Sequence, residues 1–262
     1  HKSGGLPTYN FNSGVFEDYE KIDGITLYNK HLRGHENDDQ DRFGRDTCFS
    51  CTYRCKRVAE VKDGPFKTNH LYGGPEYETI ATFGSYCGVS SMEAIIRANA
   101  LCNMYGMDTI SCGATISWAM EAWKEGKLTA EDTGGLELNY GDAEMMVRLT
   151  EMIGKREGFG DLLAEGSAMA AKKIGRGTED YLITSKGQEA PAHMPQVKRS
   201  LSIIYAANPF GADHMSSEHD PSYKSYPERM SYIGLDNPQP KLALNEDCLL
   251  YTSDAADERS SV

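Results

Sequence analysis

The sequence lacks the apolar run of about 20 residues that a helix needs to cross a bilayer, since its longest apolar runs are only a few residues. It does not open with the charged and then apolar segments of a secretory signal peptide. A basic excess is also missing, because 27 Lys and Arg stand against 39 Asp and Glu, a formal net charge of -12. These absences predict a soluble, cytoplasmic protein without a membrane or nucleic-acid partner.

The composition predicts a folded chain with a mainly helical core. With 39% hydrophobic and 25% charged side chains, 262 residues suffice for one large domain or two modest ones, so disorder is excluded as the main state. Strand signals are few and no internal repeat is present, which indicates a mainly α, multihelical fold. A Gly, Thr and Ser-rich stretch suggests a first helical domain over 1–177 and the start of a second over 178–247.

Hydrophobic periodicity and capping residues predict individual helices. The pattern Ser90 to Glu93 is a capping box that opens a helix ending at Gly106. Further helices are expected over 110–124, with both faces buried, from Asp142 to about 157, over 159–174, and from about 197 to 208. The segment 25–28 is predicted to be a short strand in an otherwise loop-dominated region of about 40 residues.

Both ends of the sequence look unlike the ends of a natural protein. The chain starts at His1 without an initiator Met, so residue 1 is interpreted as a cut inside a longer protein. Residues 248–262 resemble a translated sequencing adapter and are interpreted as non-native, so we expect no function for Cys248.

Three of the seven cysteines, Cys48, Cys51 and Cys55, form a C-x2-C-x3-C loop among polar and basic residues. Three thiolates on one short loop can ligate three irons of one cubane cluster, which still requires a fourth ligand. Zinc is the next interpretation, and a disulfide leaves one thiol over and conflicts with a cytoplasmic location. Iron-sulfur ligation is favoured by the spacing.

The other natural cysteines are expected to be structural. Cys102 lies on the apolar face of a predicted helix, and Cys87 and Cys112 lie among small residues. Burial as small hydrophobic side chains is favoured over metal ligation, although any of the three could supply a fourth ligand in principle.

Two carboxylates flank a tyrosine after the rigid turn Gly73-Gly74-Pro75. If Glu76 is buried beside a cofactor, loss of solvation would raise its pKa toward neutrality, which suits a proton donor and acceptor. The alternative is a solvated loop glutamate. A junction between two predicted helices, at 103–109, exposes backbone N-H groups that could hold a polar ligand.

A late loop packs two histidines, two aspartates and one glutamate around a glycine-containing turn. His214, His219 and Asp220 could form a mononuclear metal or proton-transfer site, and a polar surface loop is the equal alternative. His193, which follows Pro191 and Ala192, is interpreted as structural.

In combination these segments resemble the aldehyde:ferredoxin oxidoreductase family of tungsten enzymes with a bis-pyranopterin cofactor. The resemblance runs from about residue 5 to residue 247 and rests on four ordered motifs: the cysteine loop 48–55, the turn 73–79, the stretch 101–111 and the segment 160–166. It implies that the chain covers the second domain and the start of the third domain of such an enzyme.

The resemblance also implies cofactors and site residues. Cys48, Cys51 and Cys55 would ligate a [4Fe-4S] cluster, and Glu76 and His214 would lie near a tungsten or molybdenum bis-pyranopterin as catalytic groups. The family's pterin-binding pattern D-x-x-G-L-[CD] maps onto 103–108 through Asn103, Gly106, Met107 and Asp108. Asn103 and Met107 depart from that pattern: an asparagine amide can still hydrogen-bond a pterin, but its charge and donor pattern differ from those of aspartate. The family's fourth cluster cysteine would lie in sequence beyond this chain.

The sequence therefore predicts part of an oxidoreductase that converts small aldehydes to carboxylic acids and passes electrons to ferredoxin or another iron-sulfur carrier. A homodimer of the full-length protein is a further expectation, as is inactivity of this chain alone. One alternative is a family member that reduces a non-aldehyde substrate. Another, from a different class, is an electron-transfer module with a cluster and no pterin.

Overall fold

The structure is a computed structural model that describes residues 4–216, and helices dominate this range. The helices of eight or more residues are α4 (Met92–Tyr105), α5 (Thr109–Lys124), α7 (Ala143–Lys155), α9 (Ser167–Ile174) and α10 (Arg199–Ala207). The shorter ones are η1 (Tyr19–Lys21), α1 (Gly24–Lys30), η2 (His35–Asn37), α2 (Gln40–Phe43), η3 (His70–Tyr72), α3 (Tyr77–Ile80), η4 (Ala81–Ser85), α6 (Ala130–Thr133), α8 (Phe159–Leu163) and η5 (Thr178–Tyr181). The mainly α prediction is confirmed.

Strands of the described range form two small antiparallel hairpins. The first pairs β1 (Arg45–Asp46) with β2 (Lys56–Arg57), and the second pairs β3 (Thr184–Ser185) with β4 (Gln188–Glu189). None of the helices described between residues 4 and 216 is long and apolar enough to span a membrane.

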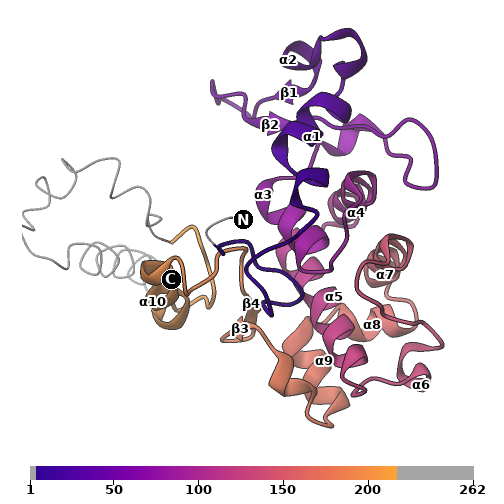
Figure 1. The fold of residues 1–262 in the computed structure, drawn as a ribbon, viewed down its shortest axis with the longest axis vertical. Helices are drawn as coiled ribbons and strands as arrows, with labels where there is room; N and C mark the ends of the chain where they lie inside the picture. The colour runs from indigo at the N-terminus through magenta and orange to yellow at the C-terminus, as the bar shows by residue number, and fades with distance from the viewer. Residues whose placement is uncertain (1–3, 217–262) are drawn as a thin grey trace, which may run out of the picture.

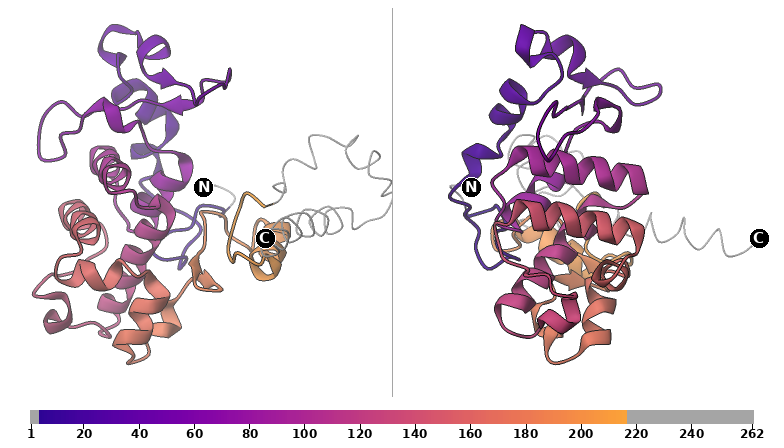
Figure 2. Two further views of the ribbon diagram at one scale, coloured as in Figure 1. Left: turned by 180° about the vertical axis from the view of Figure 1, so that it is seen from behind. Right: turned by 90° about the vertical axis from the view of Figure 1, so that its right-hand side faces the viewer.

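The helices build an elongated body with a side arm (Figure 1). The β1–β2 hairpin lies at one end, α4 and α7 pack side by side in the middle, and α9 lies toward the opposite end. The two further views show that the segment with β3, β4 and α10 leaves this body and lies beside it (Figure 2). Chain positions far apart in sequence therefore meet where this segment contacts the body.

Side-chain caps explain where the main helices begin. Ser91 accepts the N-H of Ala94 at the start of α4, and Asp108 and Asp142 cap α5 and α7 in the same manner. The predicted cap of α4 was one residue early, at Ser90. Gly106 ends α4 in the left-handed conformation, with φ of +70°, which glycine adopts without strain.

Two expectations for secondary structure are wrong. Residues 25–28 belong to α1 rather than to a strand, because Asp23 acts as a helix cap and its side chain accepts the N-H of Thr26. The helix expected over 159–174 is divided into α8 and α9, because the chain passes through Gly166 at φ of +84°. A positive φ of this kind interrupts the helical hydrogen-bond pattern.

The core joins the helices that carry the later motifs. Trp118 of α5 is 1% exposed, and its indole N-H donates to the carbonyl of Thr178 at 3.0 Å. Helix α5 also lies against η4 at Gly113, where an added Cβ would stand 2.7 Å from the Cβ of Thr82. This close approach fixes the position of the α3–η4 segment relative to the core.

We predict that Gly113→Ala lowers the free energy of unfolding by about 1 to 3 kcal/mol, because the new methyl group overpacks the α5–η4 contact. Urea unfolding followed by circular dichroism would measure the loss. Gly24→Ala is the matched control, since no atom lies within 4 Å of a Cβ at Gly24 and its φ is not positive. Equal stability of the two variants would contradict the proposed packing constraint.

Candidate functional site

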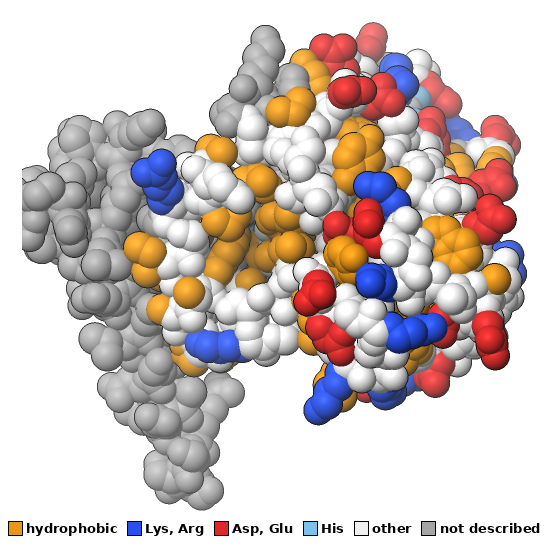
Figure 3. Space-filling view, turned by 60° about the horizontal axis from the view of Figure 1, so that its bottom comes forward, with side chains coloured by type: hydrophobic (Ala, Val, Ile, Leu, Met, Phe, Trp, Pro, Cys, Tyr) orange, Lys and Arg blue, Asp and Glu red, His pale blue; other side chains and the backbone are white. Residues whose placement is uncertain are grey.

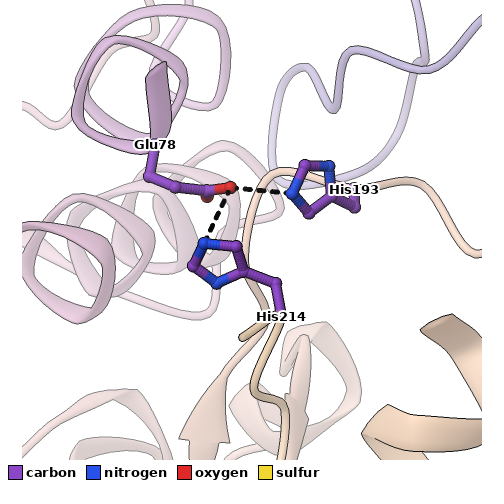
Figure 4. Close-up of side chains that lie close together, drawn as sticks. All are labelled: Glu78, His193 and His214. Carbon is purple, nitrogen blue, oxygen red and sulfur yellow. Dashed lines mark ion pairs between the residues drawn. The ribbon is translucent and has the colours of Figure 1, made fainter. Parts of the chain in front are cut away.

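Glu78, His193 and His214 form a largely buried group of titratable side chains (Figure 4). Nε2 of His193 lies 3.0 Å from Oε1 of Glu78, and Nε2 of His214 lies 3.7 Å from the same oxygen. The exposed fractions of the three side chains are 12% for Glu78, 6% for His193 and 17% for His214. One carboxylate oxygen is therefore shared by two imidazoles in a largely dry environment.

Glu78 is directed inward by the short helix α3, which follows the turn 73–75. Its second oxygen, Oε2, accepts the backbone N-H of Ala192 at 2.7 Å. Burial alone would raise the pKa of Glu78, but the contact with His193 and the Ala192 hydrogen bond outweigh burial, so this pKa lies below its ordinary value. The carboxyl group is therefore ionised near neutral pH.

Tyr77 holds the segment that carries His193. Its hydroxyl donates to the carbonyl of Ala192 at 2.9 Å, and its ring stacks on the His193 imidazole with 5.8 Å between centroids. Although 45% of Tyr77 is exposed, its hydroxyl end is turned inward, and burial raises its pKa to about 12. Tyr77 and Glu78 thus both contact Ala192 and His193.

His214 approaches from the loop that follows α10. Two side-chain bonds close this loop: Asn208 donates to the hydroxyl of Ser216 at 2.6 Å, and Ser216 donates to Asp213 at 2.5 Å. The imidazoles of His214 and His193 lie 5.4 Å apart between centroids. The other two members of the predicted late site, His219 and Asp220, lie outside the described residues.

This arrangement can perform two kinds of chemistry. The three ligand atoms lie within 4.8 Å of one another, a spacing that would admit a divalent cation. An ionised carboxylate that contacts two imidazoles can also accept a proton briefly and pass it to a neighbouring imidazole.

The structure places Glu76 away from this group. Its side chain is 59% exposed and forms an ion pair with Arg57 on the surface. The burial on which its proposed proton-transfer role depended is therefore not observed, because the N-terminal position of α3 faces Glu76 outward. The inward carboxylate of the same turn is Glu78, which sequence reasoning did not single out.

His193 was also missed as a site residue. Its interpretation as structural rested on its position after Pro191, and a prediction of its site contacts would have required knowing that this segment crosses α3. The sequence shows two acidic residues in 76–78 and a histidine much later in the chain. It does not show that these residues are in contact.

The three cysteines of the motif lie in the loop between β1 and β2, and each is exposed and free of disulfides. The guanidinium of Arg54 donates to the carbonyls of Arg42 and Arg45, which ties the loop to the hairpin base. Three accessible thiols on one short loop are a donor set that fits an iron-sulfur cluster.

Cys87, Cys102 and Cys112 are buried in the helical core, as predicted. Burial raises the pKa of the Cys87 thiol, and the pKa of Cys112 is also raised, first by its hydrogen bond with Cys102 and then by burial. Among the described residues, the thiols available at the surface are therefore those of the loop. Cys248 lies outside the described residues.

The predicted pterin segment forms the exposed junction between α4 and α5. Asn103, Gly106 and Asp108 are exposed and Met107 is half-buried. A cavity of about 370 Å³ opens beside it, and its lining includes residues 105–108 together with 163, 164 and 166. Two of the four sequence motifs, 101–111 and 160–166, thus border one cavity.

A second cavity, of about 470 Å³, lies beside the Glu78 group. Its lining includes Tyr77 and Lys198, which both contact His193. Ile22, Leu27 and Ile80 form an apolar wall. In the space-filling view, hydrophobic side chains line a hollow between the segment that carries α10 and the helical body (Figure 3).

Comparisons with known proteins identify relatives over nearly the full length of this chain. The sequence profile of aldehyde ferredoxin oxidoreductase, domains 2 & 3, matches residues 1–257. The tungsten-containing aldehyde ferredoxin oxidoreductase of Pyrococcus abyssi (strain GE5 / Orsay) is 33% identical over 265 residues, which cover 98% of this chain and 40% of that protein. The chain thus spans about 40% of the length of the first curated relatives that it matches.

Two further matches cover less of this chain. The aliphatic sulfonate oxidoreductase, WOR-like subunit, of Pyrococcus furiosus is 33% identical over 175 residues, covering 64% of this chain and 28% of that protein. The solved active site complex BamBC of benzoyl coenzyme A reductase with 1,5-dienoyl-CoA superposes with a TM-score of 0.56 at 21% identity, over 80% of this chain and 32% of that chain. At this identity the likeness shows a shared fold.

The profile match over residues 1–257 and the 33% identity over 98% of the chain agree with the helical architecture described above. The chain belongs to the aldehyde ferredoxin oxidoreductase family.

Proposed function

We propose that this chain is the cluster- and pterin-binding part of an oxidoreductase that converts an aldehyde to a carboxylic acid and passes the electrons to ferredoxin. Family membership supports an oxidoreductase, and the relative from Pyrococcus abyssi is a tungsten-containing aldehyde ferredoxin oxidoreductase. The observation that carries the proposal is the buried Glu78 carboxylate between two imidazoles, because it supplies the proton-transfer group that this reaction needs.

The reaction defines the task of these residues. An aldehyde and water give a carboxylic acid, two protons and two electrons, and the metal pterin, when bound, takes up the electron pair. The protons must leave through side chains that lie close enough to accept them and pass them on. Oxygen Oε1 of Glu78 and Nε2 of His214 are suited to this transfer, while Ala192 holds Oε2 and fixes the carboxylate plane.

The cysteine loop would hold the electron-transfer group. Cys48, Cys51 and Cys55 would each ligate one iron of a [4Fe-4S] cluster, whose chemistry is single-electron transfer. Basic side chains in the same hairpin, including Arg54 and Lys56, would offset the negative charge of the reduced cluster. The exposed junction that contains Asn103, Gly106, Met107 and Asp108, next to the 370 Å³ cavity, is the proposed pterin contact.

The substrate and acceptor belong to the proposal rather than to the family assignment. One relative is a subunit of an aliphatic sulfonate oxidoreductase, so a non-aldehyde substrate is the alternative within the family. A pterin-free electron-transfer module is the alternative of another class.

Elemental analysis of the anaerobically purified full-length protein is expected to find about four iron atoms together with tungsten or molybdenum. Cys51→Ser should lower the iron content, and Thr52→Ala in the same loop should preserve it. Iron without tungsten or molybdenum would support the electron-transfer module and overturn the proposed enzyme. Full iron content in Cys51→Ser would remove this loop as the cluster site.

We predict that Glu78→Gln lowers kcat by about 100-fold or more with metal and iron contents unchanged, because the amide cannot accept the transferred proton. Glu76→Gln is the matched control two residues away, and its kcat should stay within about twofold of wild type because Glu76 lies at the surface. Steady-state kinetics with an aldehyde and a redox dye would measure both. A large loss of kcat in Glu76→Gln, with little change in Glu78→Gln, would assign the proton-transfer role to Glu76 instead.

A further inference from the structure

We propose that Lys198 is a positioning residue of this site, which holds His193 as a neutral imidazole with its proton on Nε2, facing Glu78. His214 is then the imidazole that gains and loses a proton during turnover. The part assigned to His214 rests on the proposed function, whereas the state of His193 follows from contacts within this chain.

The contact between Lys198 and His193 determines which ring nitrogen carries the proton. Nζ of Lys198 lies 2.9 Å from Nδ1 of His193. A lysine ammonium has three donors and no acceptor, so Nδ1 must offer its lone pair. The single ring proton is then on Nε2, which lies 3.0 Å from Oε1 of Glu78, although this contact is not aligned as a linear hydrogen bond.

Local backbone structure keeps the two side chains in register. The N-H groups of Val197 and Lys198 both donate to the carbonyl of Met194, which forms a turn that brings Lys198 back to His193. The Tyr77 ring stacks on the imidazole at an interplanar angle of 23°, and only 5% of His193 is exposed. A half-turn of the ring would replace Nδ1 and Nε2 by ring carbons and so remove the contacts with Lys198 and Glu78.

The charges around Glu78 favour a neutral His193. If both imidazoles were protonated, two imidazolium groups would share one carboxylate whose Oε2 already accepts the Ala192 N-H, and the Lys198 ammonium would contact one of these cations. Among the described residues, Tyr77, Tyr86 and Tyr205 also interact with this carboxylate, and burial raises the pKa of each. They stay neutral near pH 7, so they cannot balance a second imidazolium.

His214 differs from His193 in the features that matter for proton exchange. Its Nε2 lies farther from Glu78, at 3.7 Å, and its side chain is nearly three times as exposed. The two rings are tilted by 47°, so they reach the same oxygen from different directions. One imidazole is thus held with Nε2 facing Glu78, and the other is placed to exchange a proton with Glu78.

The test is ¹⁵N NMR of the full-length enzyme labelled at histidine, with the His193 signals assigned by their loss in His193→Gln. In wild type we expect one protonated and one bare ring nitrogen throughout about pH 5 to 8, the range in which histidine ordinarily titrates. In Lys198→Met the second nitrogen should gain a proton as the pH falls through that range. Lys198→Arg should restore the wild-type pattern, because guanidinium groups also only donate.

The wild-type measurement stands even if Lys198→Met fails to fold. A second proton on wild-type His193 within that range, or a bare Nε2, would overturn the proposal, as would Lys198→Met spectra identical to wild type. The pH profile of kcat for Lys198→Met should show an added ionisation on its acid side. Absence of tungsten and molybdenum would defeat the proposed function and leave the NMR result intact, so the two failures are distinguishable.

Discussion

The site depends on a single carboxylate oxygen, Oε1 of Glu78, which is withdrawn from water and shared by two histidines. A buried charge is unfavourable unless it is hydrogen-bonded and paired, and Glu78 meets this requirement through the Ala192 N-H and the His193 imidazole. The partners come from segments more than 110 residues later in the chain. The folding of the side segment against the helical body is therefore what creates the site.

The packing that positions Glu78 extends through the core. Gly113 lets α5 approach η4, and Tyr77 holds the chain at Ala192. The hydroxyl of Tyr86, which follows η4, donates to the carbonyl of Ala190. Residues 77, 78 and 86 thus contact residues 190, 192 and 193. These contacts hold the Glu78 carboxylate and the His193 imidazole within hydrogen-bonding distance of each other, a proximity that proton transfer requires.

Sequence patterns predicted the long helices because their causes are local. Ser91, Asp108 and Asp142 cap α4, α5 and α7 within the first turn, and the apolar residues of these helices recur at helical spacing. The same local reasoning wrongly predicted a strand over 25–28, where Asp23 caps a helix. The three loop cysteines could be singled out from spacing alone, because their pattern is itself local; their ligand role stays a prediction.

The rest of the site could not be predicted because it depends on direction in space. Glu76 precedes α3 in extended backbone and Glu78 lies within α3, so the two carboxylates point in different directions, and the sequence does not say which one faces inward. The contact of His193 with Glu78 spans 115 positions and requires the tertiary fold. The resemblance to the family pointed to this turn and to His214, whose catalytic role stays a prediction, whereas the inward carboxylate emerged only from the structure.

The central claim, that Glu78 is a buried carboxylate held ionised by its partners, is tested most directly by infrared spectroscopy of the full-length protein. The carboxylic acid band of Glu78, assigned by its loss in Glu78→Gln, would be followed as the pH is lowered. Because the pKa of Glu78 lies below its ordinary value, the band should be absent at neutral pH and grow in only below the usual range for glutamate, about pH 4.3. A Glu78 band that is present at pH 7 would contradict the account.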